Sequence, residues 1–196
     1  MTPKIKICGI TSVHDAELAL ECEADYLGVI FADSPRRVAI ETAKEISKMA
    51  TPLVGVFQNQ PLSFVQEVLA EVKLDFVQLH GEESPEYCQT LPLPVIKVFT
   101  AHYPLDWDRI GPYQQVDFLM LDKPHDYLEQ AITFFKEERD QLPPVFLAGG
   151  LNAENVSMFI QSAQPYAVDV ASGVESEPGI KDPQKLQAFC QAVQRL

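Results

Sequence analysis

Eight short runs of apolar and β-branched residues recur along the chain at nearly regular intervals. They begin near residues 4, 26, 53, 75, 94, 117, 144 and 166, so 19 to 27 residues separate the start of one run from the next. Each interval has room for one helix and two short loops, which is the connection that neighbouring parallel strands require. Eight such units in 196 residues predict an α/β chain that forms one domain, a single (β/α)8 TIM barrel over residues 1–196.

A doubly wound open sheet is the alternative to the barrel. Neither the glycine fingerprint of dinucleotide-binding sheets nor a P-loop occurs in the chain, and this favours the barrel. Apolar residues recur at helical spacing in four intervals: 12–24, 39–50, 62–72 and 152–163. Ser12 and Asn152 are favourable N-caps for the first and last of these helices. After the fifth run, Pro104, Gly111 and Pro112 leave room only for a short or broken helix.

The charge balance excludes several classes of partner. The formal net charge is −13, which argues against general affinity for nucleic acid or for anionic membranes. No apolar run approaches the roughly 20 residues that a membrane span needs, and the start of the chain lacks the apolar core of a signal peptide, so we expect a cytoplasmic protein. The cysteines form no CxxC pair and no zinc-binding spacing: Cys8, Cys22, Cys88 and Cys190. The oligomeric state cannot be read from this pattern.

Polar and reactive residues follow the predicted strands. In a (β/α)8 barrel the C-terminal ends of the strands meet around one mouth, where the reacting groups of such enzymes gather. The residues at these ends are Cys8, Ser34 to Arg36, Gln58, His80, Asp122, Gly149, Gly150, Ser172 and Gly173. We therefore expect one site at this face of the barrel.

Two glycine turns indicate a phosphate-binding site. The stretches LAGGLNAENV and VASGVE follow the seventh and eighth runs, where many barrels of this kind bind phosphate through backbone N–H groups. Glycine allows the backbone to approach an anion closely. The pair of turns predicts a phosphorylated small-molecule substrate bound by Gly149, Gly150, Ser172 and Gly173. Tight loops without a ligand are the alternative.

Cys8 is a candidate general base, although a free cysteine is more often a small buried apolar residue. Strand alternation directs Ile5 and Ile7 toward the helices and places Lys6 and Cys8 on the inner face. A neighbouring ammonium group favours the thiolate, so we expect Lys6 to lower the pKa of Cys8. Lys6 needs a counter-charge inside a barrel. Because the eighth strand closes against the first, we predict an ion pair between Lys6 and Asp169 beneath the site.

Asp122 ends the apolar run FLMLD. The carboxylate could cap the following segment. Across a narrow barrel mouth from a thiol, it could instead serve as the acid of an acid–base pair, with one group protonating while the other abstracts a proton. For His80, in QLHGEE, a structural role at the strand end is favoured over proton transfer.

Seven stretches together resemble one known family. They are KICGIT, LGVIFADSPRRV, VQLHGEE, VIKVF, FLMLD, LAGGLNAENV and AVDVASGVESEPGIKD, and they span nearly the whole chain. In this order they resemble phosphoribosylanthranilate isomerase, the enzyme of tryptophan biosynthesis.

The resemblance implies a (β/α)8 barrel without metal or cofactor. The implied reaction is the Amadori rearrangement of N-(5'-phosphoribosyl)anthranilate to 1-(2-carboxyphenylamino)-1-deoxyribulose 5-phosphate. The family's general base falls on Cys8 and its general acid on Asp122. The arginine that holds the anthranilate carboxylate falls on Arg36. The family's phosphate loops fall on the two glycine turns.

The chain departs from the family after Asp122. Members usually carry a glycine-rich loop there, resembling GGTGxxFDW, whereas this chain reads DKPHDYLEQAITFFKEERDQLPP. The pattern predicts a helix from about Asp126 and a sixth loop too short to close as a lid. Two alternatives therefore stay open. One is a non-catalytic binder of phosphate ligands. The other is an isomerase of a related sugar phosphate, such as the barrel enzyme of histidine biosynthesis, which Cys8 disfavours because that family typically has aspartates at both catalytic strand ends.

Overall fold

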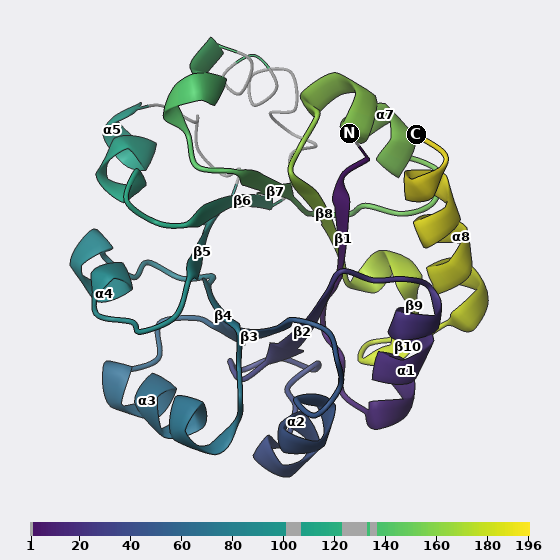
Figure 1. Cartoon of the computed structure of the whole chain (residues 1–196), viewed down its shortest axis with the longest axis horizontal. Coiled ribbons are helices and arrows are strands. Elements are labelled where there is room, and N and C mark those ends of the chain that lie inside the picture. Colours follow the sequence, from purple (N-terminus) through teal and green to yellow (C-terminus); the bar gives the residue numbers. More distant parts are fainter. Residues whose placement is uncertain (1, 101–106, 123–132, 134–136) are drawn as a thin grey trace.

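The computed structural model describes residues 2–100, 107–122, 133 and 137–196. Its strands β1 to β8 form a closed parallel barrel in chain order, ringed by helices (Figure 1). The barrel strands are β1 (Lys4–Ile7), β2 (Tyr26–Ile30), β3 (Leu53–Phe57), β4 (Phe76–Leu79), β5 (Val95–Thr100), β6 (Phe118–Asp122), β7 (Val145–Leu147) and β8 (Ala167–Val170). The predicted barrel is confirmed, and each predicted run begins within one residue of the observed strand. The open-sheet alternative is wrong.

The barrel closes where β1 pairs with β8. In this register Lys6 lies opposite Asp169. Ile5 and Ile7 point outward into the apolar layer between strands and helices, as their alternation predicts. A second apolar cluster contains the inward-facing Tyr26 and Phe146 together with other side chains of the barrel interior. The interior is therefore packed rather than open, as is usual for this fold.

The helices that the structure describes lie outside the barrel (Figure 1). They are α1 (Val13–Glu21), α2 (Ile40–Ile46), α3 (Leu62–Glu71), α4 (Pro85–Gln89), α5 (Trp107–Ile110), α7 (Val156–Ala163) and α8 (Pro183–Gln194). Ser12 caps α1 as predicted, because its hydroxyl accepts a hydrogen bond from the N–H of Asp15 at 3.0 Å. Helix α5 is a single turn followed by a 3₁₀ turn, which confirms the short helix predicted after the fifth strand.

The predicted start of α7 is wrong. The helix begins at Val156, and Asn152 lies in the preceding turn, where its side-chain oxygen accepts from the N–H groups of Glu154 and Asn155. Asparagine forms such local bonds as readily in turns as at helix caps, so the sequence alone did not distinguish the two.

The predicted helix from about Asp126 and the predicted short sixth loop fall on residues 123–132 and 134–136, which lie outside the described residues. None of the helices in the described ranges is both long and apolar enough to cross a membrane.

A small antiparallel hairpin follows β8, which the sequence analysis did not predict. Strands β9 (Glu175–Glu177) and β10 (Ile180–Lys181) form it, with Gly179 at positive φ between them. Helix α8 then begins at an Asp182 cap. The hairpin returns the chain toward the mouth of the barrel, where Lys181 bonds to the backbone after β1.

Candidate active site

A cavity of about 300 Å³ opens at the C-terminal end of the barrel. It brings together residues at or just beyond the ends of β1, β2, β4, β6, β7 and β8, and Val56 of β3 also lines it. Its lining includes Cys8, Arg36, His80, Asp122, Gly149, Gly150, Asp169 and Ser172. Lys6 and Gly173 lie next to lining residues, whereas Gln58, which follows β3, is exposed and outside the lining. Among the polar residues of the lining, Gln78 was not predicted.

Lys6 and Asp169 form the predicted ion pair, with Nζ and Oδ1 2.6 Å apart. The Lys6 side chain is fully buried, and its ammonium also interacts with the thiol of Cys8. Lysine is buried in this way only with a counter-charge, which Asp169 provides. The interaction fixes the ammonium between a carboxylate and the candidate base.

The expected pKa shift of Cys8 is wrong in direction. Burial raises the pKa of the thiol, and this outweighs the lowering by Lys6, while Asp169 raises it further. A thiolate in a water-poor interior loses more hydration than one nearby ammonium restores when that ammonium is already paired with a carboxylate. In the ligand-free protein the thiol therefore holds its proton more tightly than a free cysteine.

Gly28 on β2 makes room for this cluster. A Cβ atom added to Gly28 would lie 2.8 Å from Sγ of Cys8 and 3.1 Å from Nζ of Lys6. Both distances are shorter than ordinary contacts, so any larger residue would displace the thiol or the ammonium. The strand stretch YLGVIF thus carries a functional residue that the sequence analysis missed. A glycine in the middle of a buried strand was the available signal.

His80 hydrogen-bonds the candidate acid. Its Nε2 lies 3.1 Å from Oδ2 of Asp122, and the Gln78 amide nitrogen lies 3.5 Å from its Nδ1. An amide N–H at Nδ1 leaves the imidazole proton on Nε2, where it faces the carboxylate. Gln78 is almost fully buried, and its Oε1 has no hydrogen-bond partner among the described residues. The histidine at the end of β4 thus contacts the candidate acid directly.

The two predicted phosphate loops lie side by side. Gly149 and Gly150 have φ of 93° and 71°, which favours glycine at both positions. Ser172 and Gly173 begin a 3₁₀ turn, where N–H groups have no partner within the turn. A Cβ added to Gly173 would lie 1.9 Å from the carbonyl oxygen of Leu151, so the loops touch. The geometry suits an anion held by backbone N–H groups.

Arg36 lies at the rim of the same cavity and pairs with a residue that the sequence analysis did not consider. Its guanidinium donates to both carboxylate oxygens of Glu175 at 2.7 to 3.0 Å. Glu175 also accepts from Lys181. Glu175 and Lys181 both lie in the stretch VESEPGIKD. The Pro-Gly turn between them was the sequence signal that could have predicted their pairing.

No group of three histidine, cysteine, aspartate or glutamate side chains in the described ranges is arranged to hold a metal ion.

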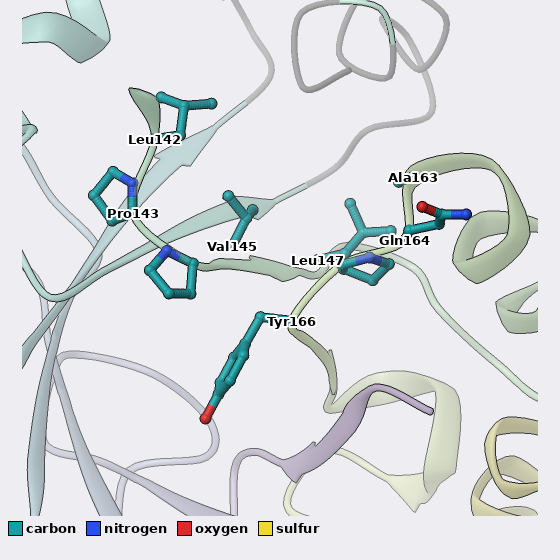
Figure 2. A pocket seen from close by; sticks show the side chains of 9 residues that line it. Leu142, Pro143, Val145, Leu147, Ala163, Gln164 and Tyr166 are labelled. Atoms are coloured by element: carbon teal, nitrogen blue, oxygen red, sulfur yellow. The ribbon is translucent and has the colours of Figure 1, made fainter. Parts of the chain in front are cut away.

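A second cavity, of about 330 Å³, lies at the opposite end of the barrel, near the start of β7 and β8. Figure 2 shows its largely apolar lining, with Leu142 and Pro143 on one side of Val145, Leu147 beside Gln164 on the other, and the ring of Tyr166 below. Among its lining residues only the Tyr166 phenol is titratable. The lining of this cavity contains no acid–base pair, whereas Cys8, His80 and Asp122 line the cavity at the C-terminal end.

Comparison with known proteins agrees with this placement. The family model described as "N-(5'phosphoribosyl)anthranilate (PRA) isomerase" matches residues 5–192. N-(5'-phosphoribosyl)anthranilate isomerases of Geobacter metallireducens and Geotalea uraniireducens are 41% and 42% identical over 194 residues, covering 95% of this chain and 96% of each relative.

Solved structures show the same likeness. A phosphoribosylanthranilate isomerase from Thermotoga maritima superimposes with a TM-score of 0.90 at 35% identity, covering 99% of this chain and all of that one. Another solved structure with 35% identity and a TM-score of 0.89 is a phosphoribosyl anthranilate isomerase in complex with reduced 1-(o-carboxyphenylamino)-1-deoxyribulose 5-phosphate. It likewise covers 99% of this chain and 100% of its own.

Proposed function

Because the chain belongs to the N-(5'-phosphoribosyl)anthranilate isomerase family, we propose that it performs that reaction with Cys8 as general base and Asp122 as general acid. The activity, an isomerisation in tryptophan biosynthesis, follows from the family. The residue roles rest on one observation above all: a thiol after β1 and a carboxylate ending β6 line the same cavity. These strands are not neighbours in the barrel, so the two groups face a substrate from different sides.

The reaction needs one proton delivered and another removed. Asp122 protonates the furanose ring oxygen, the C1'–O bond breaks, and the anilino nitrogen supplies the electron pair that forms an iminium ion. The positive charge acidifies the hydrogen at C2', and Cys8 removes it. The resulting enolamine gains a proton at C1' and loses the one on its 2'-oxygen, which gives the ketose with no net change in atoms.

The surroundings of Cys8 match this role. Its raised pKa makes the thiolate, once formed, a stronger base than a free cysteine thiolate. The iminium charge adjacent to C2' favours that thiolate when it is needed, in addition to the Lys6 ammonium. Lys6 and Asp169 thus act as supporting residues that hold the base in place.

The two ends of the substrate have separate binding groups. Arg36 binds the anthranilate carboxylate, since a guanidinium fork matches a carboxylate in shape and charge. Gly149, Gly150, Ser172 and Gly173 bind the phosphate through backbone N–H groups. His80 orients Asp122 through the 3.1 Å contact. The phosphorylated substrate is a small molecule, and we propose neither a nucleic-acid nor a membrane partner.

We further propose that residues 1–196 act as one domain in the cytoplasm. The supporting observations are the closure of β8 onto β1 and the presence of four free cysteines, which are typical of a reducing compartment.

The experiment that tests the activity is a steady-state assay with N-(5'-phosphoribosyl)anthranilate, run beside the aldose substrate of the barrel isomerase of histidine biosynthesis. We expect conversion of the first and little or none of the second. Conversion of the second alone would replace the proposed substrate. Tight binding of the first without turnover would favour the non-catalytic binder.

A further inference from the structure

The aliphatic part of the Arg36 side chain packs over Gly9, the residue that follows Cys8. Gly9 has φ of +72°, and a Cβ added to it would lie 2.7 Å from Cδ of Arg36. The glycine of KICGIT therefore gives the arginine a path along the mouth of the barrel, next to the candidate base. This path brings the guanidinium to Glu175, 139 residues further along the chain.

Glu175 occupies one edge of that guanidinium. Arg36 Nε donates to Oε1 and Oε2 at 2.8 and 3.0 Å, and Nη2 donates to Oε2 at 2.7 Å. Nη1 donates to no residue that the structure describes. A guanidinium has a second edge, formed by Nη1 and the remaining N–H of Nη2, which can hold another carboxylate with two parallel hydrogen bonds. The glutamate thus orients the fork while leaving the substrate's edge available.

Glu175 is held in turn by two lysines. Lys181 Nζ donates to Oε1 at 3.0 Å, and Lys185 Nζ donates to the backbone carbonyl of Glu175 at 2.8 Å. The same Lys181 ammonium donates to the carbonyl oxygen of Cys8 at 2.6 Å. Glu175 and Lys181 are both buried. The buried Glu175 carboxylate therefore contacts both Arg36 and Lys181, and Lys181 in turn binds the backbone of Cys8.

The charges of this cluster also suit one incoming carboxylate. Arg36 and Lys181, the two cations that bind the Glu175 carboxylate, carry one positive charge each and Glu175 carries one negative charge, so these three side chains leave a single net positive charge. Without Lys181, the glutamate would cancel the charge of Arg36 and repel a substrate carboxylate. With it, Glu175 can orient the arginine and the cluster still attracts an anion.

We propose that Glu175 is a positioning residue that fixes Arg36 for the anthranilate carboxylate, with Lys181 holding the glutamate in place. The inference rests on the proposed function, in which Arg36 binds that carboxylate. It adds the residue that sets the direction of the fork, and it gives the β9–β10 hairpin a role in substrate recognition.

The test compares Glu175→Gln with Glu177→Gln, which alters an exposed glutamate on the same strand. An amide presents N–H groups to a donor-only guanidinium, so it cannot accept at both atoms. We expect Glu175→Gln to lower kcat/KM for N-(5'-phosphoribosyl)anthranilate roughly 10- to 100-fold, mainly through KM, because the lost orientation concerns a part of the substrate remote from the reacting carbon. Glu177→Gln should stay within twofold of the parent.

A double-mutant cycle separates positioning from general weakening of the fold. In an Arg36→Ala background the Glu175→Gln change should have no further effect on kcat/KM, whereas a purely structural loss would add to that of Arg36→Ala. Parent-like kcat/KM in Glu175→Gln, with Arg36→Ala impaired, would overturn the positioning role and leave the proposed function intact. An inactive parent, or parent-like kinetics in Arg36→Ala, would instead contradict the proposed function.

Arg36→Lys provides a second test if Glu175→Gln does not fold. Lysine keeps the charge but cannot present two separate edges, so kcat/KM should fall nearly as far as in Arg36→Ala. Parent-like kinetics in Arg36→Lys would show that charge suffices and would overturn the role of Glu175.

Discussion

The two ends of the barrel interior are built from the same strands but from opposite kinds of side chain. At the N-terminal end, aromatic rings pack edge to face or tilted, with centroids 5.3 to 5.9 Å apart: Tyr26, Phe76, Phe118, Phe146 and Tyr166. At the C-terminal end the interior holds charged groups, among them the Lys6–Asp169 pair. Two further buried pairs, Lys97–Glu83 and Lys181–Glu175, lie around its mouth.

The difference predicts that the aromatic end contributes mainly to the stability of the fold and the charged end mainly to activity. Burial of aromatic surface is favourable without further conditions. Buried ion pairs often add little net stability because desolvation offsets their attraction, so we expect the charged end to contribute less to stability than the aromatic end. The following predictions test this division, beginning with the largest expected effect.

Cys8→Ala and Asp122→Asn should each lower kcat by about three orders of magnitude or more, because each removes one of the two proton-transfer groups. Thermal unfolding of both variants should stay close to that of the parent. Gln58→Ala, an exposed change after β3 outside the cavity, is the matched control. A kcat within tenfold of the parent in either variant would reject the role assigned to that residue.

Phe146→Ala should show the reverse pattern. Phe146 is fully buried in the aromatic end, so its truncation should lower the free energy of unfolding by about 3–5 kcal/mol. Chemical denaturation measures this loss. The kcat of the folded fraction, assayed well below the unfolding transition, should be nearly unchanged. A large fall in kcat without a loss of stability would mean that the two ends are not separable.

Glu83→Gln should change how stability depends on pH. Burial alone would raise the pKa of Glu83, but the hydrogen bonds from Lys97 and from the Asn59 N–H together hold it below its usual range. A carboxyl whose pKa is lower in the folded state adds stability that is present above its unfolded value, near 4.5, and is lost as the pH falls through the folded value.

The variant should therefore be less stable than the parent at pH 7, by about 1–3 kcal/mol, since Lys97 loses its charged partner. The difference should begin to shrink below about pH 4.5, where Glu83 of the unfolded parent takes up a proton, and should continue to shrink until the pH passes the lower pKa of the folded parent. Denaturation curves at several pH values measure it, with Glu82→Gln as the exposed neighbouring control. A difference that stays constant from pH 7 to pH 3 would contradict the assignment.

The smallest effect is expected from Tyr166→Phe at the aromatic end. It removes the 2.8 Å hydrogen bond between the Tyr26 and Tyr166 hydroxyls and keeps both rings. Tyr166 is partly exposed, so water can replace the lost partner, and we expect a loss of about 0.5–1 kcal/mol with unchanged kcat. A loss above about 2 kcal/mol would give this polar contact a larger share of stability than the packing around it.

The predicted Lys6–Asp169 contact was confirmed because regular strands set its geometry. The ion pair of Lys6 with Asp169 followed from alternation along β1 and from closure against β8, both of which are regular. The prediction failed where neighbours came from irregular segments. Asn152 was predicted to be a helix cap but lies in a turn. Glu175, the partner of Arg36, lies in a hairpin whose short strands show no hydrophobic periodicity in the sequence.

The sequence by itself determined where the strands begin, which of their residues face inward, and which strand ends carry the candidate acid and base. These features depend on the periodicity of apolar residues along the chain, which can be read directly from the sequence. Only the tertiary structure decided the direction of the Cys8 pKa shift and the pairing of Arg36 with Glu175. Hydration and Coulomb energies depend on distances and burial in three dimensions, so burial could outweigh Lys6 at the thiol, and a glutamate distant in the chain could orient the arginine.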